Sequence, residues 1–379
     1  MKYRTLGRTG LNVSIIGMGC EGFVEKPYEA VKELMDEMER SGVNIIDLYS
    51  PDPEMRKNLG RAMEGRRDKY ILQAHLCTVW KDGQYKRTRD ITEVIPSFEN
   101  QLELLGTDHV EIGMIHYVDA LSDWEEVVNG DVMKQAIQWK NEGKIGCIGL
   151  STHNPQVGIA VVESGLVDVI MFSVNPCYDL QPAGENVEDL WAEKAYAGHL
   201  LNMDPERQAF YELCERTGVG ITVMKAFGGG DLLNAAISPA GAALTHAQCI
   251  QYALDRPGVA TVLCGAKTMD QLRDDVAFEE ADCGYAEALA SFPKISWKGH
   301  CMYCGHCAPC PVGVSVADVT KFLNLALAQG MVPETVREHY AALDVKASAC
   351  VECGACETRC PFEVSIRENM RKAAEVFGE

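Results

Sequence analysis

The chain has 379 residues, of which 47% are hydrophobic and 24% are charged, a composition typical of a folded globular protein. This length exceeds one ordinary hydrophobic core, so we expect a large domain and a smaller one. The formal net charge of -20 argues against nucleic acid or an anionic membrane as a partner, since both bind basic faces. The N-terminus carries no apolar signal region, no stretch is long enough to span a bilayer, and eight of the 16 cysteines are scattered along the chain. We therefore expect a protein of the reducing cytoplasm.

The N-terminal part of the chain alternates between two kinds of segment. Residues 3–13 form two short runs around Gly-Arg-Thr-Gly, which predicts a small hairpin. Short apolar runs then alternate with stretches of helical periodicity. The expected strands are Ile15–Gly19, Asn44–Tyr49, Tyr70–Leu76, Val110–Tyr117, Ile145–Ser151, Val167–Val174, Gly220–Ala226 and Thr261–Gly265, and the expected helices are 28–41, 53–63, 92–105, 131–142, 155–164, 205–217, 243–255 and 269–276. Eight strand–helix units predict an α/β fold, a (β/α)8 TIM barrel; the alternative is an open doubly wound sheet.

Two connections in this region are unusually long. They run from Cys77 to Asp90 and from Cys177 to Asp204, after the third and sixth expected strands. Barrel enzymes build their sites at the C-terminal ends of the strands, so we expect lids here rather than plain surface loops.

The C-terminal part carries two cysteine runs with the same spacing, C-x2-C-x2-C-x3-C-P. The first consists of Cys301, Cys304, Cys307 and Cys310, and the second of Cys350, Cys353, Cys356 and Cys360. In bacterial ferredoxins of this spacing the fourth cysteine of each run binds the other cluster. We therefore predict two [4Fe-4S] clusters, one held by Cys301, Cys304, Cys307 and Cys360, the other by Cys350, Cys353, Cys356 and Cys310. A zinc ribbon would lack the third and fourth thiols, and a disulfide framework would need an oxidising compartment.

The segment between the two runs, residues 316–349, has helical periodicity. This favours a mainly α-helical ferredoxin-type domain over a compact βαββαβ ferredoxin. We expect the barrel to occupy residues 1–280 and the dicluster domain residues 281–379.

Several segments resemble the aldo-keto reductase superfamily. They are MKYRTLGRTGLNVSIIGMG, the strand end at residues 44–47, MIHYVD, KIGCIGLSTHN and VLCGAKTMDQL. Together with the cysteine runs, they look like the branch of that superfamily with a fused ferredoxin domain. The resemblance implies a TIM barrel in which Asp, Tyr, Lys and His polarise a carbonyl while NADPH delivers hydride.

The resemblance also indicates catalytic positions. Asp47 and His116 match the family's Asp and His, but Asp52 stands at the Tyr position and His75 at the Lys position. Tyr49, two residues after Asp47, is then the secondary candidate for the proton donor. We expect Asp47, His75, His116 and Tyr49 to be the catalytic residues.

A third histidine, His153, follows another strand, so three imidazoles are expected at neighbouring strand ends. Two imidazoles and a carboxylate can also hold a divalent metal, which stays a lesser alternative.

The cofactor pocket is only partly similar to that of the family. Candidate cofactor-binding residues are Ser151, Lys225, Gly228, Gly229, Lys267 and Thr268. Lys267 and Thr268 match positions that family members use for the adenosine phosphate, and the glycines could let backbone amides approach a pyrophosphate. NADP(H) or a flavin is thus possible in the barrel.

Iron–sulfur clusters pass single electrons, whereas hydride transfer moves two. The first hypothesis is therefore an anaerobic oxidoreductase in which two clusters feed a small-molecule substrate or a flavin at the barrel mouth. The second is an NADP(H)-dependent reductase with structural or regulatory clusters. The third is a non-catalytic electron-transfer protein that serves a ferredoxin or another redox partner.

Overall fold

The structure is a computed structural model that describes residues 1–179, 204–236, 238, 242–278, 283–284, 288, 301, 307–329, 331–332, 334–360 and 363–379. The chain forms two compact units. The barrel unit comprises Met1–Ala183, Asn202–Ala226 and Thr245–Tyr285, and the C-terminal unit comprises Gly184–Leu201, Phe227–Leu244 and Ala286–Glu379. The boundary expected between residues 280 and 281 lies outside the described residues and stays a prediction.

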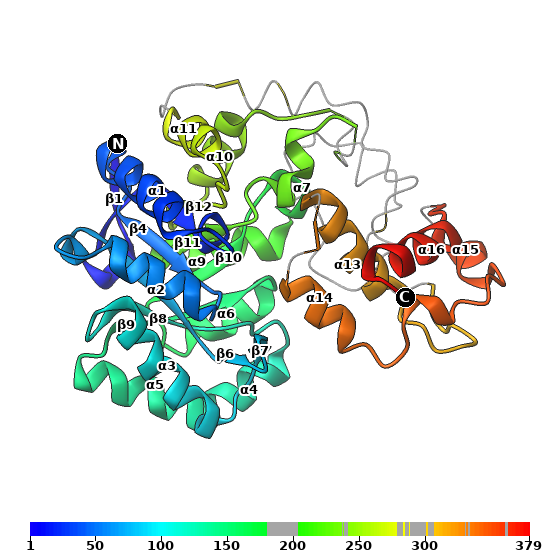
Figure 1. The fold of residues 1–379 in the computed structure, drawn as a ribbon, viewed down its shortest axis with the longest axis horizontal. Coiled ribbons are helices and arrows are strands. Elements are labelled where there is room, and N and C mark those ends of the chain that lie inside the picture. The colour runs from blue at the N-terminus through cyan, green and yellow to red at the C-terminus, as the bar shows by residue number, and fades with distance from the viewer. Residues whose placement is uncertain are drawn as a thin grey trace. The chain divides into compact units, whose positions relative to one another are not determined.

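The barrel unit contains a closed parallel sheet of eight strands, in the order β3-β4-β5-β8-β9-β10-β11-β12 (Figure 1). The strands are β3 (Ile16–Gly19), β4 (Ile45–Leu48), β5 (Ile71–Leu76), β8 (Val110–Ile115), β9 (Ile145–Thr152), β10 (Val169–Ser173), β11 (Gly220–Met224) and β12 (Val259–Cys264). The expected TIM barrel is confirmed, and each strand lies within two residues of its predicted bounds.

Helices follow the strands and surround the barrel. They are α1 (Tyr28–Ser41), α2 (Pro53–Ala62), α3 (Ile91–Leu105), α4 (Leu121–Asn129), α5 (Asp131–Glu142), α6 (Pro155–Glu163), α7 (Pro176–Asp179), α9 (Pro205–Thr217), α10 (His246–Leu254) and α11 (Met269–Val276). Proline stands in the first turn of α6 and α9, where a missing amide costs nothing. α1 ends at Gly42, whose φ of 80° is left-handed and suits glycine.

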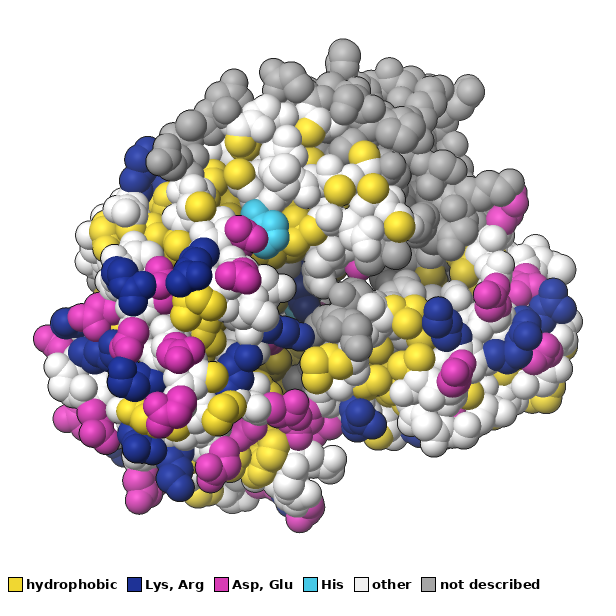
Figure 2. All heavy atoms as spheres, turned by 45° about the horizontal axis from the view of Figure 1, so that its top comes forward, with side chains coloured by type: hydrophobic (Ala, Val, Ile, Leu, Met, Phe, Trp, Pro, Cys, Tyr) yellow, Lys and Arg dark blue, Asp and Glu magenta, His cyan; other side chains and the backbone are white. Residues whose placement is uncertain are grey.

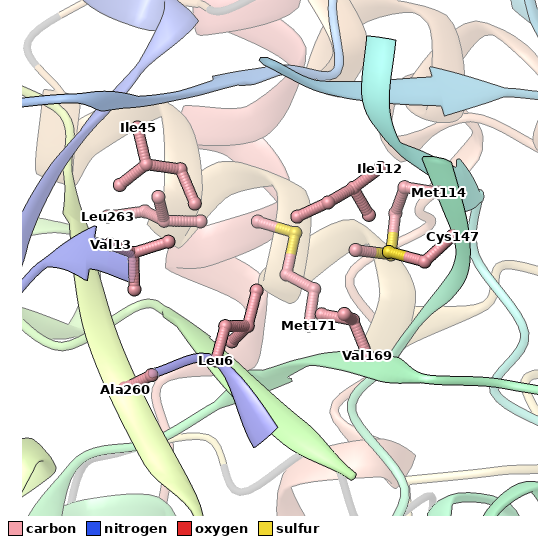
Figure 3. Close-up of a cluster of buried hydrophobic side chains, with 10 residues drawn as sticks. All are labelled: Leu6, Val13, Ile45, Ile112, Met114, Cys147, Val169, Met171, Ala260 and Leu263. Carbon is pink, nitrogen blue, oxygen red and sulfur yellow. The ribbon is translucent and has the colours of Figure 1, made fainter. Parts of the chain in front are cut away.

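The N-terminal hairpin closes one end of the barrel. β1 (Tyr3–Thr5) pairs antiparallel with β2 (Asn12–Ser14), as expected for residues 3–13. Leu6 and Val13 from this hairpin meet side chains from the barrel strands (Figure 3). This apolar floor consists of Leu6, Val13, Ile45, Ile112, Met114, Cys147, Val169, Met171, Ala260 and Leu263. Burial of each large apolar side chain stabilises the fold by about 1.5–3 kcal/mol.

A second, smaller sheet lies in the connection after β5. It is the hairpin of β6 (Thr78–Lys81) and β7 (Gln84–Arg87), which begins one residue after Cys77. Cys77 has a left-handed φ of 68°, which turns the chain out of β5. The sequence predicted a long connection that acts as a lid at this place, without strands of its own, so the hairpin is an addition to the expected fold. The second long connection, after Cys177, falls mostly outside the described residues.

The C-terminal unit is helical in its described part. Its elements are η5 (Gly228–Leu233), α13 (Val316–Gln329), α14 (Glu334–Ala341), η6 (Ala347–Ala349), α15 (Ala355–Arg359) and α16 (Ile366–Phe377). Val319, Leu323 and Ala326 of α13 are buried at helical spacing, as are Met370 and Ala373 of α16, the helix on which α13 packs. The expectation of a mainly α-helical ferredoxin-type domain is confirmed.

The outer helices of the barrel carry both signs of charge. Acidic and basic side chains are interleaved over the barrel on the face shown in Figure 2. Many of them pair locally, as Lys32 does with Asp36 on α1 at 2.6 Å and Arg66 with Glu39 at 2.9 Å. Such exposed pairs contribute about 0–1 kcal/mol each. Among the described residues, no helix is long and apolar enough to cross a bilayer.

Candidate functional site

A series of buried polar side chains lies inside the barrel above the apolar floor. Gln73 of β5 crosses the barrel, because its Oε1 accepts a hydrogen bond from the Thr222 hydroxyl of β11 at 3.0 Å. Its Nε2 lies 3.5 Å from the sulfur of Met171 in the floor and donates to Oδ1 of Asp47 at 2.6 Å. The same Asp47 oxygen lies 2.9 Å from Nε2 of His75. Asp47 and His75 are each 2% exposed, so these hydrogen bonds are shielded from water.

The series continues from His75 to the end of the next strand. His75 Nδ1 lies 2.6 Å from Nδ1 of His116, whose backbone N–H donates to the carbonyl of Leu76. His116 Nε2 lies 2.7 Å from the hydroxyl of Tyr85, and Tyr85 is only 2% exposed. We call Asp47, His75, His116 and Tyr85 the polar relay. The structure thus brings three of the four expected catalytic residues into direct contact, in the order of the strands that carry them.

The hydrogen bonds fix the proton positions for neutral imidazoles and an ionised Asp47. A carboxylate only accepts, so the His75 proton is on Nε2 and its Nδ1 is an acceptor. His116 must then carry its proton on Nδ1, which leaves Nε2 to accept from the Tyr85 hydroxyl. Each donor in the relay consequently faces one acceptor, and every hydrogen bond is donated in the direction from Tyr85 towards Asp47.

The hairpin that carries Tyr85 is fastened to helix α3. Lys81 on β6 and Lys86 on β7 share one face of the hairpin and bind the two oxygens of Glu93 at 2.5 and 2.8 Å. The hydrogen bonds from Lys81 and Lys86 lower the pKa of Glu93 to about 2, so its charge persists at neutral pH. A two-stranded hairpin is marginal by itself, and this anchorage helps to hold Tyr85 in place.

Tyr49 lies beside the relay without a hydrogen bond to it, and Asp52 is engaged elsewhere. The rings of Tyr49 and His75 are 6.5 Å apart, and within the described chain the Tyr49 hydroxyl has no hydrogen-bond partner. Burial, with the nearby Glu21 carboxylate, raises the pKa of Tyr49 well above its usual range, which makes it a weaker acid. Asp52 caps helix α2: its Oδ1 accepts from the backbone N–H groups of Glu54 at 2.8 Å and Met55 at 3.1 Å.

A carboxyl group that the sequence did not suggest lies near Asp47. Burial raises the pKa of Glu21, Asp47 raises it further, and Lys225 opposes this. Gly19 leaves room for this carboxyl group, since a Cβ at that position would come within 2.6 Å of Glu21 Oε2. Lys225 follows β11 with a left-handed φ of 63°, a strained conformation that departs from strand alternation.

His153 is not part of the relay. Its Nδ1 lies 3.0 Å from Asp119 Oδ2. Burial would raise the pKa of Asp119, but His153 and its hydrogen bonds outweigh burial and lower it. Within the residues described, no three Asp, Glu, His or Cys side chains are grouped to hold a single metal ion. The relay residues bond in sequence rather than around one point, which disfavours the metal alternative.

The C-terminal unit contains a hollow lined by thiols of both cysteine runs. Its walls include Cys310 of the first run and Cys350, Cys353 and Cys356 of the second, the four residues predicted to share a cluster. Valine and methionine side chains complete the wall, namely Val312, Val314, Val316, Val351 and Met370, together with Arg359 and Arg367. Four thiols in a largely apolar hollow fit a [4Fe-4S] cluster.

The other predicted ligand set is only partly described. Cys301, Cys307 and Cys360 are described, whereas Cys304 lies outside the described residues. Arg359 links the two runs, because its Nη2 donates to the carbonyls of Cys307 at 2.5 Å and Pro309 at 2.8 Å. The assignment of this second set stays a prediction.

Comparison with known proteins accounts for both units. The model of the aldo/keto reductase family matches residues 16–248, well over half of the chain. The chain belongs to the aldo/keto reductase family. A model described as a 4Fe-4S dicluster domain matches residues 300–365, so this aldo/keto reductase carries a C-terminal iron–sulfur domain.

Individual relatives resemble the barrel portion of the chain. The uncharacterized oxidoreductase YqkF of Bacillus subtilis is 26% identical over 288 residues, which cover 73% of this chain and 90% of YqkF. L-galactose dehydrogenase of Arabidopsis thaliana is 27% identical over 302 residues, covering 73% and 88%. The solved structure of aldo-keto reductase AKR11C1 from Bacillus halodurans has a TM-score of 0.60 at 20% identity, with 77% of this chain and 97% of that chain covered. These matches show an oxidoreductase with the family fold.

The residues expected on the cofactor side of this aldo/keto reductase are divided between the units. Ser151 is 4% exposed at the end of β9, where its hydroxyl accepts from the backbone N–H of Tyr117 at 2.8 Å. Lys267 and Thr268 precede α11, and Thr268 caps that helix through the backbone N–H of Gln271. Gly228 and Gly229, by contrast, belong to η5 in the C-terminal unit. Cofactor binding by these residues stays a prediction.

Sequence reasoning missed Tyr85, Gln73 and Glu21 as parts of the site. Gln73 gave a usable signal, because a polar residue two positions before His75 on a buried strand faces the same side of the barrel. Tyr85 gave a weaker signal, because it lies in the connection from Cys77 to Asp90 that was expected to be a lid; its contact with His116 depends on a hairpin that no periodicity in the loop indicated.

Proposed function

We propose that the chain is an anaerobic iron–sulfur oxidoreductase that reduces a small polar carbonyl-type or oxygen-bearing compound at the barrel mouth. The observation that carries the proposal is the uninterrupted series of hydrogen bonds from Asp47 through His75 to His116. The thiol-lined hollow of the C-terminal unit supports it. Clusters bound by these cysteines would supply electrons one at a time.

The barrel residues manage protons in this proposal. Reduction of a carbonyl to an alcohol consumes two electrons and two protons, and electrons from clusters arrive without protons. His116 is half-buried at the end of β8, so it can exchange protons with water while His75 holds its orientation. Asp47 fixes the tautomer of His75 and stabilises positive charge that develops on either imidazole.

The relay also bears on the two positions at which this chain departs from the catalytic residues of the family. That resemblance places Asp52 where the family has its proton-donating tyrosine, and Asp52 is engaged in capping α2. It places His75 where the family has a lysine, and His75 contacts Asp47 as that lysine would be expected to. A site altered in this way supports chemistry in which imidazoles take the place of a permanent cation.

A second candidate is NADP(H)-dependent reduction at the same relay, with structural or regulatory clusters. Membership of the aldo/keto reductase family favours it, together with Ser151 at the mouth and Lys267 and Thr268 before α11. In this case the hydride from NADPH carries both electrons and one hydrogen to the carbonyl carbon, and the relay supplies a proton to the carbonyl oxygen.

The test uses the protein prepared anaerobically with its clusters. We would measure turnover of small carbonyl compounds driven by dithionite in native protein, His116→Ala and Cys353→Ala. Matched controls are His109→Ala, an exposed histidine outside the relay, and Cys283→Ala, a cysteine outside both runs. The proposal expects both test variants to lose turnover and both controls to keep it.

Two results would contradict the proposal. NADPH-driven turnover that survives in Cys353→Ala would favour the second candidate. Clusters that exchange electrons with a ferredoxin, in a protein that turns over no small molecule, would favour a non-catalytic electron-transfer role.

A further inference from the structure

The β6–β7 hairpin presents two functional groups on the face opposite its anchor. Thr78 pairs with Arg87 and Trp80 with Tyr85, so these four side chains share one face. Lys81 and Lys86 lie on the other face and bind Glu93. Tyr85 and Arg87 are therefore neighbours on one strand, with Cα atoms about 7 Å apart.

Tyr85 is the first hydrogen-bond donor of the relay, at the end farthest from Asp47. Its hydroxyl is 2.7 Å from His116 Nε2, the one nitrogen of the relay that must accept from it. Tyr49 lacks such a connection, since its ring lies 6.5 Å from the His75 ring and no hydrogen bond within the described chain joins its hydroxyl to the relay. Asp52 is committed to its helix cap.

Arg87 has an unusual environment two residues further along. Its guanidinium carbon lies 3.9 Å from the centre of the Tyr117 ring, and its Nη1 is buried without a hydrogen-bond partner. A buried guanidinium nitrogen without an acceptor is costly, which calls for an explanation such as a ligand. The Tyr117 ring lies 6.2 Å from the His116 ring, which places Arg87 beside the relay.

We propose that Tyr85 is the catalytic proton donor and that Arg87 binds a carboxylate of the substrate. The hairpin thereby selects small carbonyl compounds that carry a carboxylate. A planar guanidinium matches a carboxylate in a two-pronged hydrogen bond, and its strong preference for this geometry gives specificity. The inference rests on the proposed reduction at this site, and it holds for either source of electrons.

The reduction transfers two electrons and two hydrogens to the carbonyl. Two electrons reach the carbonyl, either singly from reduced iron–sulfur clusters or as hydride from NADPH. The O–H bond of Tyr85 breaks and a new O–H bond forms on the substrate oxygen, while carbon gains the other hydrogen as a proton or as the hydride. Water then protonates His116 at Nε2, and His116 passes this proton to the phenolate of Tyr85.

The first arm of the test measures steady-state turnover of pyruvate in native protein and Tyr85→Phe. We expect kcat to fall about 100- to 10,000-fold with KM changed by less than about threefold, because the ring remains and only the proton is lost. Tyr28→Phe on α1 removes a hydroxyl far from the relay in sequence and serves as the control. An unchanged kcat in Tyr85→Phe, or a larger loss in Tyr49→Phe, would overturn the assignment of the acid.

The second arm measures binding by calorimetry and needs no turnover. Native protein is titrated with pyruvate and succinic semialdehyde, and with their uncharged counterparts diacetyl and butanal. Arg87→Gln is expected to weaken binding of the two anions at least about tenfold and to leave the neutral compounds unaffected. Arg40→Gln on α1 is the matched control, since it removes the same charge from an exposed guanidinium outside the hairpin.

The outcomes separate this inference from the function on which it rests. Equal effects of Arg87→Gln and Arg40→Gln, or no anion binding by the native protein at millimolar concentration, would overturn the carboxylate site. Absence of turnover with every probe and either reductant would overturn the proposed function, and the binding arm would then decide the Arg87 site by itself.

Discussion

Replacement of Asp47 by asparagine tests how the relay is held together. Oδ1 of Asp47 accepts from His75 Nε2 at 2.9 Å and from Gln73 Nε2 at 2.6 Å, and asparagine has nearly the same shape. Its amide oxygen can still accept from both groups, but the negative charge is gone. The variant therefore tests the charge of Asp47 with little change in packing.

The structure allows the size of the effect to be worked out. Hydrogen bonds to a charged group contribute about 1.5–3 kcal/mol each and neutral ones about 0.5–1.5 kcal/mol, so two bonds lose roughly 2–3 kcal/mol together. A catalytic proton transfer is worth about 100- to 10,000-fold, and each factor of ten corresponds to about 1.4 kcal/mol of activation free energy. We expect Asp47→Asn to lose activity within that range while the fold remains intact.

The assay compares kcat and the free energy of unfolding in native protein and Asp47→Asn under anaerobic conditions. Gln73→Glu is a useful companion, because it places a second carboxyl group against Asp47 and should also disturb the tautomer of His75. Full activity in Asp47→Asn, with unfolding free energy reduced as expected, would refute a role for this charge in proton transfer.

Two further predictions concern stability. Arg56 on α2 is 1% exposed, and within the described residues its Nε and Nη2 have no hydrogen-bond partner. Because these nitrogens are buried and unpaired, Arg56→Met should raise the free energy of unfolding, measured by chemical denaturation, by about 1–3 kcal/mol. A decrease would show that the guanidinium is paired in the native protein. Burial raises the pKa of Asp231 from its ordinary value of 3.8 to about 6. Its contribution to stability is therefore present below about pH 4 and lost as the pH rises through about 6. Asp231→Asn should make the melting temperature less dependent on pH between about pH 4 and 6. An unaltered pH profile would count against a buried carboxyl group at this position.

The barrel could be predicted because every strand–helix unit is specified locally. Helix α1 runs over the predicted residues 28–41, since apolar residues recur at helical spacing and Gly42 provides the left-handed stop. The cysteine spacing was equally informative, because only side chains at fixed intervals can surround one cluster. Cys310 and three cysteines of the second run line one hollow, whereas the exchange of the fourth ligand stays a prediction.

Only the site residues that stand on barrel strands could be predicted from the sequence. Asp47, His75 and His116 stand at the ends of parallel strands, which meet at one end of a barrel whatever their loops do. Tyr85 reaches the same place through a hairpin whose direction depends on the turn at Cys77 and on ion pairs to Glu93. These are tertiary contacts, and strand alternation does not extend across a residue with a left-handed φ. For the same reason Tyr49 was a plausible donor in the sequence, although the structure leaves its hydroxyl outside the hydrogen-bond series.

The most direct test of the central claim is a single-turnover experiment. Protein reduced with dithionite and freed of excess reductant is mixed anaerobically with pyruvate, and the signal of the reduced clusters is followed beside product formation. Since a carbonyl takes two electrons and each cluster gives one, we predict about one product per protein chain as the clusters are oxidised at the same rate. Clusters that stay reduced while NADPH alone drives the reaction at full rate would contradict the account.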